Sequence, residues 1–120
     1  MDIILLIGRV LFGSYFLYNA YKHFAYVEGL AAYAGSKHVP HPKLAVLGSG
    51  VLLFVGGLSI MLAVRVGILG WALVLFLVPV TYQMHAFWKE QGDAHAAQEI
   101  QFTKNVALLG AVLMIIVLYR

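Results

Sequence analysis

The sequence LAVLGSGVLLFVGGLSIMLAVRVGILGWALVLFLVPVTYQM occupies residues 44–84. Its long apolar character determines the class of fold. Arg65 is its only charged residue and divides it into two apolar runs, 44–64 and 66–84. Each run has about the 20 residues that a helix needs to cross a bilayer core. Both runs are continuously apolar rather than alternating, which favours helices over barrel strands. Because almost no loop separates them, we expect a tight antiparallel helical hairpin within a membrane.

Two further apolar runs flank this hairpin. Ile3–Tyr21 is interrupted only by Arg9 and Asn19, among otherwise apolar and small residues, and Val106–Tyr119 ends the chain. As a helix the last run would be only about 21 Å long, against a hydrocarbon core of about 30 Å. Either the helix extends backwards and brings Lys104 and Asn105 into the headgroup layer, or the bilayer thins locally and Lys104 snorkels outward.

The spans therefore predict a single integral membrane domain over residues 1–120. We expect an all-α, antiparallel four-transmembrane-helix bundle with its N- and C-termini on the same side, and with spans of about 3–22, 44–64, 66–87 and 101–119. The composition agrees, because 62% of the residues are hydrophobic and only 11% are charged. A soluble domain of this size could not bury so much apolar surface.

The chain has no cysteine, which excludes thiolate, iron–sulfur and covalent c-type haem chemistry. Its net charge of +3 reflects loop lysines near lipid headgroups, not a nucleic-acid footprint. The lysine distribution places the histidine-containing connections on the cytoplasmic side, unless those lysines line a site. No nucleic-acid partner is expected.

All five histidines lie in the two connections on one side of the predicted bundle, residues 22–43 and 85–103. In the first connection, residues 25–33 favour an interfacial helix, which Gly35 and the sequence His38-Val39-Pro40-His41-Pro42 then break. In the second, a break is expected at Gly92–Asp93. The histidine spacing matches no metal-ligand motif, and loop histidines are usually solvated, so no metal site is predicted.

Polar residues from all four spans are expected at one depth, near the histidine side. Tyr15 and Asn19 share a face of the first span, as do Thr81, His85 and Trp88 of the third. Two interpretations remain open: a ligand pocket, or an interhelical hydrogen-bond layer with an aromatic belt. The candidate ligand-binding residues are Tyr15, Asn19, Thr81, His85, Trp88, Lys104 and Asn105. No catalytic residue can be assigned.

Arg9 is a charge buried about a third of the way across the first span. No acidic residue occurs within any span. Arg9 must therefore snorkel, or use Ser59, backbone carbonyls, an anionic lipid headgroup or a ligand.

The chain resembles the DoxX family of small four-helix membrane proteins. The resemblance rests on Arg9–Gly13 with Asn19–Phe24, on Gly50 with Gly56–Leu58, and on Pro79–Thr81, His85–Trp88 and Phe102–Ala111. Two positions depart from the family: Leu53 stands where many members have glutamate, and Asn19 where many have histidine. An intramembrane Arg–Glu pair, and a proton relay based on it, are therefore not expected.

The family takes its name from a subunit of a thiosulfate:quinone oxidoreductase, so the resemblance implies a quinone-linked subunit or accessory of a membrane oxidoreductase. In that hypothesis His85 carries protons and Lys104 favours an anionic form of the quinone. The electrons come from a soluble or membrane redox partner. The alternatives are a non-enzymatic scaffold, assembly factor or chaperone for a membrane partner or lipid, and a transporter, which would require a homo-oligomer. The expected location is the cell membrane of a prokaryote.

Overall fold

The computed structural model describes residues 2–120 and is built of helices throughout that range. The helices are α1 (Ile3–Ala25), α2 (Val27–Ser36), α3 (Pro42–Leu62), α4 (Val66–Leu69), α5 (Trp71–Met84), the 3-10 helix η1 (Phe87–Lys89) and α6 (Gly92–Tyr119). Over residues 2–120, four helical segments are long and apolar enough to cross a membrane: 3–25, 42–62, 66–89 and 92–119. The prediction of an all-α protein with four candidate spans is confirmed. The placement of both termini on one membrane side stays a prediction.

Local signals explain where the helices begin and end. The carboxylate of Asp2 accepts hydrogen bonds from the N–H groups of Ile4 and Leu5, at 2.9 and 3.3 Å, and so caps α1. Pro42 occupies the first turn of α3, where its missing N–H costs nothing. Gly92, with φ of +64°, begins α6, at the break expected from the sequence. The helix of the last span thus extends backwards well beyond residue 101.

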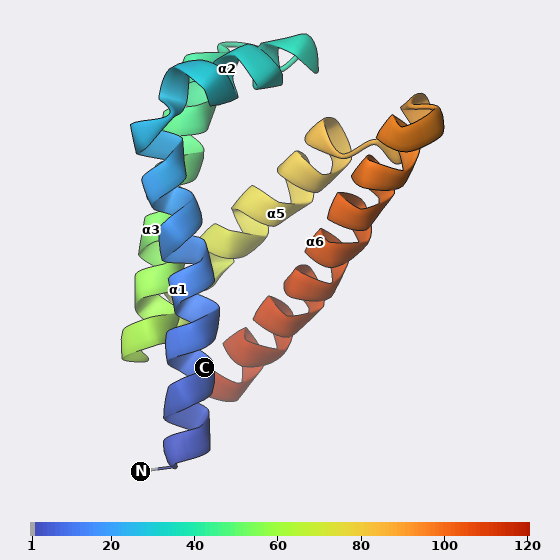
Figure 1. Ribbon diagram of the computed structural model, residues 1–120. Coiled ribbons are helices and arrows are strands. Elements are labelled where there is room, and N and C mark those ends of the chain that lie inside the picture. Colours follow the sequence, from blue (N-terminus) through green and yellow to red (C-terminus); the bar gives the residue numbers. More distant parts are fainter. Residues whose placement is uncertain (1) are drawn as a thin grey trace.

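The four long helices form two antiparallel pairs, α1 with α3 and α5 with α6 (Figure 1). Glycines allow the backbones to approach within the first pair. A Cβ atom on Gly13 would lie 2.8 Å from the carbonyl oxygen of Gly57, and one on Gly57 would lie 3.0 Å from that of Gly13. Small residues at such crossings are the usual means of close packing between membrane helices.

The two pairs meet at the end of the molecule that carries the α3–α4 turn. Gly56 of α3 packs directly against the side chain of Leu73, and a Cβ on Gly70 would lie 2.8 Å from Ile116 of α6. A core of buried side chains fills this end, including Ile60, Val66 and Leu73. Close approach and dense packing therefore join the pairs here.

Away from this end the pairs diverge, so that α5 leans away from α3 (Figure 1). The short connection at Arg65 was predicted correctly, but the tight hairpin was not. The glycines at the start of the third span face the C-terminal end of the fourth: a Cβ on Gly67 would lie 2.8 Å from Arg120, and one on Gly70 2.8 Å from Ile116. The helix of the third span runs beside the fourth and away from the second (Figure 1).

Helix α2 lies across the divergent end and covers the space between the pairs (Figure 1). Its buried residues Ala31 and Ala34 pack with Val46 of α3, and Leu30 and Met84 border this small cluster. The helix expected in the first connection is therefore present, but it runs through Gly35 and ends at Ser36, beyond the predicted break at Gly35. Its place at the membrane interface stays a prediction.

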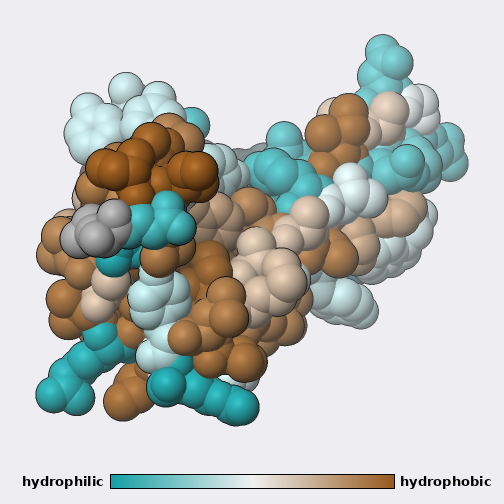
Figure 2. Space-filling model, turned by 90° about the horizontal axis from the view of Figure 1, so that it is seen from below, coloured by the Kyte–Doolittle hydropathy of each residue, from teal (hydrophilic) through white to brown (hydrophobic). Residues whose placement is uncertain are grey.

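The outer surface of the spans is apolar. Side chains such as Ile4, Leu11, Phe54, Leu75 and Leu118 are half or more exposed. Figure 2 shows apolar side chains over much of the molecule, with hydrophilic ones on the right, where η1 and the start of α6 project, and in smaller groups on the left and along the lower edge. Such a surface is stable only in contact with lipid.

Candidate functional site: a cavity between the helix pairs

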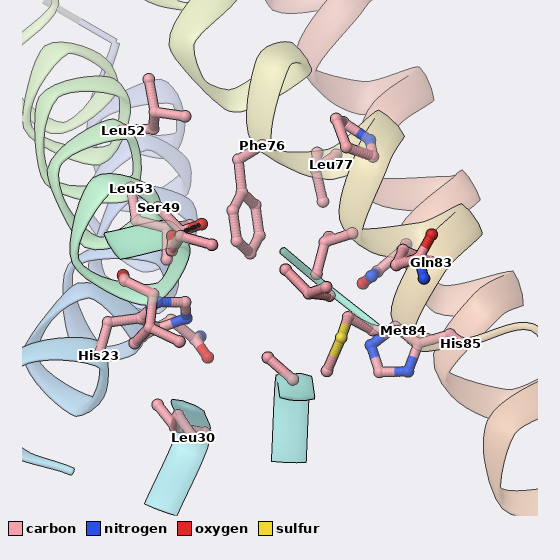
Figure 3. Close-up of a pocket in the computed structure, with 18 of the residues that line it drawn as sticks. His23, Leu30, Ser49, Leu52, Leu53, Phe76, Leu77, Gln83, Met84 and His85 are labelled. Carbon is pink, nitrogen blue, oxygen red and sulfur yellow. Dashed lines mark hydrogen bonds between the residues drawn. The ribbon is translucent and has the colours of Figure 1, made fainter. Parts of the chain in front are cut away.

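A cavity of about 720 Å³ lies between the two helix pairs at their divergent end. Its walls come from α1 and α3 on one side and from α5 and α6 on the other, with α2 and the following loop covering it (Figure 3). Most of the lining is aliphatic or aromatic, as with Leu52, Leu53 and Phe76. Size and lining are those of a pocket for a small, largely apolar molecule.

The structure brings five of the seven predicted site residues to this one cavity. They are Tyr15 and Asn19 from α1, His85 after α5, and Lys104 and Asn105 from α6. Asn105 is 6% exposed, and within residues 2–120 its amide has no hydrogen-bond partner from another side chain. The Asn19 amide donates to the carbonyl of Tyr15 at 2.8 Å, which leaves its oxygen free to accept.

Thr81 and Trp88 lie outside the cavity, which corrects the face predicted for the third span. Thr81 is buried within the helix packing, and its hydroxyl has no partner among the described residues. Trp88 lies half-exposed in η1 and stacks against Tyr82 and Phe102. Helix α5 ends at Met84, and the chain changes direction at His85, so Trp88 is not one helical turn beyond His85.

His23 is a cavity residue that sequence reasoning assigned to a connection. Helix α1 continues to Ala25, so His23 lies one turn beyond Asn19 on the same face. Its Nδ1 donates to the carbonyl of Val46 in α3 at 3.0 Å, because a carbonyl can only accept. Its ring meets that of Phe76 edge-on, with 5.8 Å between centroids. The spacing of Asn19 and His23, four residues apart, was the signal available in the sequence.

His85 is held by a short hydrogen-bonded chain that reaches α2. Its Nδ1 lies 2.8 Å from Oε1 of Gln98, to which it donates. The Nε2 of Gln98 in turn donates to the Tyr33 hydroxyl at 2.6 Å. Gln98 and Tyr33 were not predicted as site residues, because the contact joins positions far apart in the sequence. The chain fixes the orientation of the His85 ring.

Lys104 lies where α6 faces α1 at the edge of the cavity. Its Nζ donates to Oε1 of Gln101 at 2.8 Å and lies 5.6 Å from the ring centroid of Tyr15. A cation over an aromatic face is attracted by the ring quadrupole. This contact links α1 to α6, which do not otherwise pack closely there. The Lys104 ammonium supplies the positive charge of the cavity lining.

Polar contacts fasten the end of α2 over the cavity. Lys37 Nζ forms an ion pair with Oε1 of Glu90 at 2.7 Å, and the Gln83 amide donates to the carbonyl of Lys37. The hydrogen bond to Glu90 raises the pKa of Lys37 above its usual value. Together with the Gln98–Tyr33 hydrogen bond, these contacts join α2 to the second helix pair.

Arg9 lies at the opposite end from the cavity. Its Nε is buried and, over residues 2–120, has no hydrogen-bond partner. The Ser59 hydroxyl donates to the carbonyl of Val64 at 2.6 Å and is not hydrogen-bonded to Arg9 Nε. Arg9 is partly exposed, so snorkelling, a lipid headgroup and a ligand all stay predictions for this charge.

The histidines do not assemble into a metal centre. In the part of the chain that the structure describes, no three histidine, aspartate or glutamate side chains come together in a way that could hold a metal ion. His38 and His41 lie in the α2–α3 loop with positive φ, away from His23 and His85.

Four apolar membrane-crossing helices with a lined cavity at one end define a small multi-pass membrane protein that contacts the lipid bilayer. The DoxX family model matches residues 4–86, and the chain belongs to the DoxX family. It is also similar to the inner membrane protein YphA of Escherichia coli (strain K12), with 26% identity over 113 residues that cover 94% of this chain and 81% of the relative. No solved structure matches the chain significantly.

Proposed function

We propose that this protein binds an isoprenoid quinone in the cavity, as a quinone-linked subunit or accessory of a membrane oxidoreductase. The observation that carries the proposal is the lining of the cavity, which combines a largely apolar wall with polar side chains from both helix pairs. A molecule with a polar ring and a long apolar tail matches that arrangement. Its volume of about 720 Å³ lies within the usual range for small-molecule sites.

The charges of the lining restrict the head of the ligand. Lys104 lines the cavity, and within the described chain no aspartate or glutamate does. Uncompensated positive headgroups are therefore disfavoured, whereas a neutral ring or an oxyanion is accepted. The hydroxyl and carbonyl oxygens of a quinone ring fit this requirement, with Lys104, Asn105 and His85 as candidate hydrogen-bond partners.

In this proposal the apolar tail leaves the cavity towards lipid between α1 and α6, which do not pack closely against each other. Both helices line the cavity, yet the Lys104–Tyr15 contact is the one aromatic–cation contact between them over residues 2–120. Tyr15 and Lys104 are both exposed at this edge. In this proposal the electrons are exchanged with a partner protein, since the chain has no cysteine to hold an iron–sulfur cluster.

The test is to quantify quinone in lipid extracts of the purified protein. We expect close to one quinone per chain in the wild type and strong loss in the double variant His85→Ala/Lys104→Ala. The matched control is Lys89→Ala/His95→Ala, which removes the same two residue types outside the cavity lining and should retain quinone. If wild-type extracts contain no quinone and a membrane protein co-purifies stoichiometrically, a scaffold, assembly-factor or chaperone role replaces this proposal.

A further inference from the structure

Two imidazole rings enter the cavity from opposite walls, His23 from α1 and His85 from the end of α5 (Figure 3). Each ring is anchored through the same nitrogen. His23 Nδ1 donates to the Val46 carbonyl at 3.0 Å, and His85 Nδ1 donates to Gln98 Oε1 at 2.8 Å. One anchor is a backbone carbonyl and the other a side-chain amide. In both cases an oxygen accepts a hydrogen bond from a protonated Nδ1.

The anchors determine what the free nitrogen of each ring can do. In a neutral imidazole one nitrogen donates and the other accepts. With the proton on Nδ1, Nε2 carries a lone pair and acts as an acceptor. In the described chain, no protein donor is hydrogen-bonded to either Nε2. The cavity therefore offers two acceptors that require donors from a ligand.

Resting on the quinone site proposed above, we propose that the cavity binds the reduced quinol in preference to the oxidised quinone. A quinol has two hydroxyl groups on opposite sides of its ring, and each can donate to one Nε2. A quinone has only carbonyl oxygens, which would face the imidazole lone pairs without a proton between them. A buried acceptor left without a donor costs enough to change affinity about tenfold.

The remaining polar groups do not reverse this preference. Lys104 donates one hydrogen bond to Gln101 Oε1 and has two further N–H groups, which a quinone carbonyl or a quinol hydroxyl can accept. A quinol hydroxyl also accepts hydrogen bonds through its lone pairs, so a donor such as Lys104 is satisfied by either form. Asn105 presents both a donor and an acceptor. The two Nε2 atoms are thus the groups that distinguish the forms.

The experiment compares the affinity of the full-length protein in detergent, under anaerobic conditions, for a decyl-substituted benzoquinone and for its quinol. We expect the quinol to bind about tenfold or more tightly. Asparagine places an amide near the position of Nδ1 and nothing at Nε2, whereas glutamine reaches the position of Nε2. His23→Asn and His85→Asn should therefore reduce the preference towards equality, and His23→Gln and His85→Gln should retain more of it.

A second readout is independent of the ligand. Nitrogen NMR of histidine-labelled protein should report a protonated Nδ1 and an unprotonated Nε2 for both rings. Protonated Nε2 atoms, or a quinone that binds as tightly as the quinol, would overturn the preference while leaving the quinone site intact. Failure of both forms to bind would instead overturn the proposed function.

Discussion

Gly13 of α1 and Gly57 of α3 touch backbone to backbone: a Cβ on Gly13 would lie 2.8 Å from the Gly57 carbonyl oxygen and 2.9 Å from the Cβ of Met61. The obstacle is backbone, which cannot rotate away. Gly13→Ala should therefore lower the free energy of unfolding in detergent by about 1–3 kcal/mol. Gly8→Ala, on the same helix with nothing within 4 Å, should change it by less than about 1 kcal/mol, in the stabilising direction. Equal destabilisation by both variants would contradict the close crossing.

The two hydroxyls Ser59 and Thr81 are both buried but differ in their partners. Ser59 donates to the carbonyl of Val64 at 2.6 Å, whereas the Thr81 hydroxyl is unpartnered among residues 2–120. Ser59→Ala should thus reduce stability by about 1 kcal/mol. Thr81→Val, which removes an unsatisfied polar group, should leave stability unchanged or raise it. The quinone content of Thr81→Val should equal that of the wild type. A lower quinone content would show that Thr81 contributes to the binding site.

The stabilisation that the Lys37–Glu90 ion pair provides should be lost at strongly alkaline pH. Its hydrogen bond raises the pKa of Lys37 above the usual value of about 10.4. The stabilisation is then complete below about pH 10.4 and is lost as the pH rises through the higher folded-state pKa. Thermal unfolding of the wild type and Glu90→Gln should differ at pH 7, by about 1 kcal/mol or less, and converge at strongly alkaline pH.

The exposed Lys43–Glu28 pair, 2.9 Å apart with side chains 61% and 79% exposed, provides the control for that comparison. Glu28→Gln should have no measurable effect on thermal unfolding at any pH, because solvent screens such a pair. If Glu28→Gln and Glu90→Gln behave alike, the Lys37–Glu90 contact does not fasten α2.

Gln98 positions His85 rather than contacting the ligand. Gln98→Leu removes the acceptor for His85 Nδ1, so the ring is free to place its proton on either nitrogen. We expect the preference for quinol over quinone to fall severalfold, and the NMR signals of His85 to report mixed tautomers. Tyr33→Phe keeps the His85–Gln98 bond and loses only the second link. It should therefore have the smaller effect, and a larger one would contradict the positioning role.

Much of this architecture could be predicted from the sequence because lipid imposes strict rules on it. The apolar runs on either side of Arg65, a helix within the first connection and the start of α6 at Gly92 each follow from hydropathy, turn residues or helix length. Helical spacing predicted that polar residues of different spans lie at one depth. Five of them, Tyr15, Asn19, His85, Lys104 and Asn105, line the same cavity.

What could not be predicted depends on tertiary contacts. The divergence of the helix pairs depends on which helices pack together, and the apolar pattern of the spans does not specify that choice. The placement of Trp88 was wrong because α5 ends at Met84 without a glycine or proline nearby to indicate it. Gln98 and Tyr33, 65 positions apart, have no shared pattern in the chain.

The quinone content of the purified protein tests directly whether the cavity holds a quinone. Lipid extracts of wild-type protein, freed of loosely bound lipid, should contain close to one quinone or quinol per chain. Extracts of His85→Ala/Lys104→Ala should contain little, and those of Lys89→Ala/His95→Ala should match the wild type. Equal quinone content in all three proteins, or no quinone in the wild type, would contradict a quinone site in this cavity.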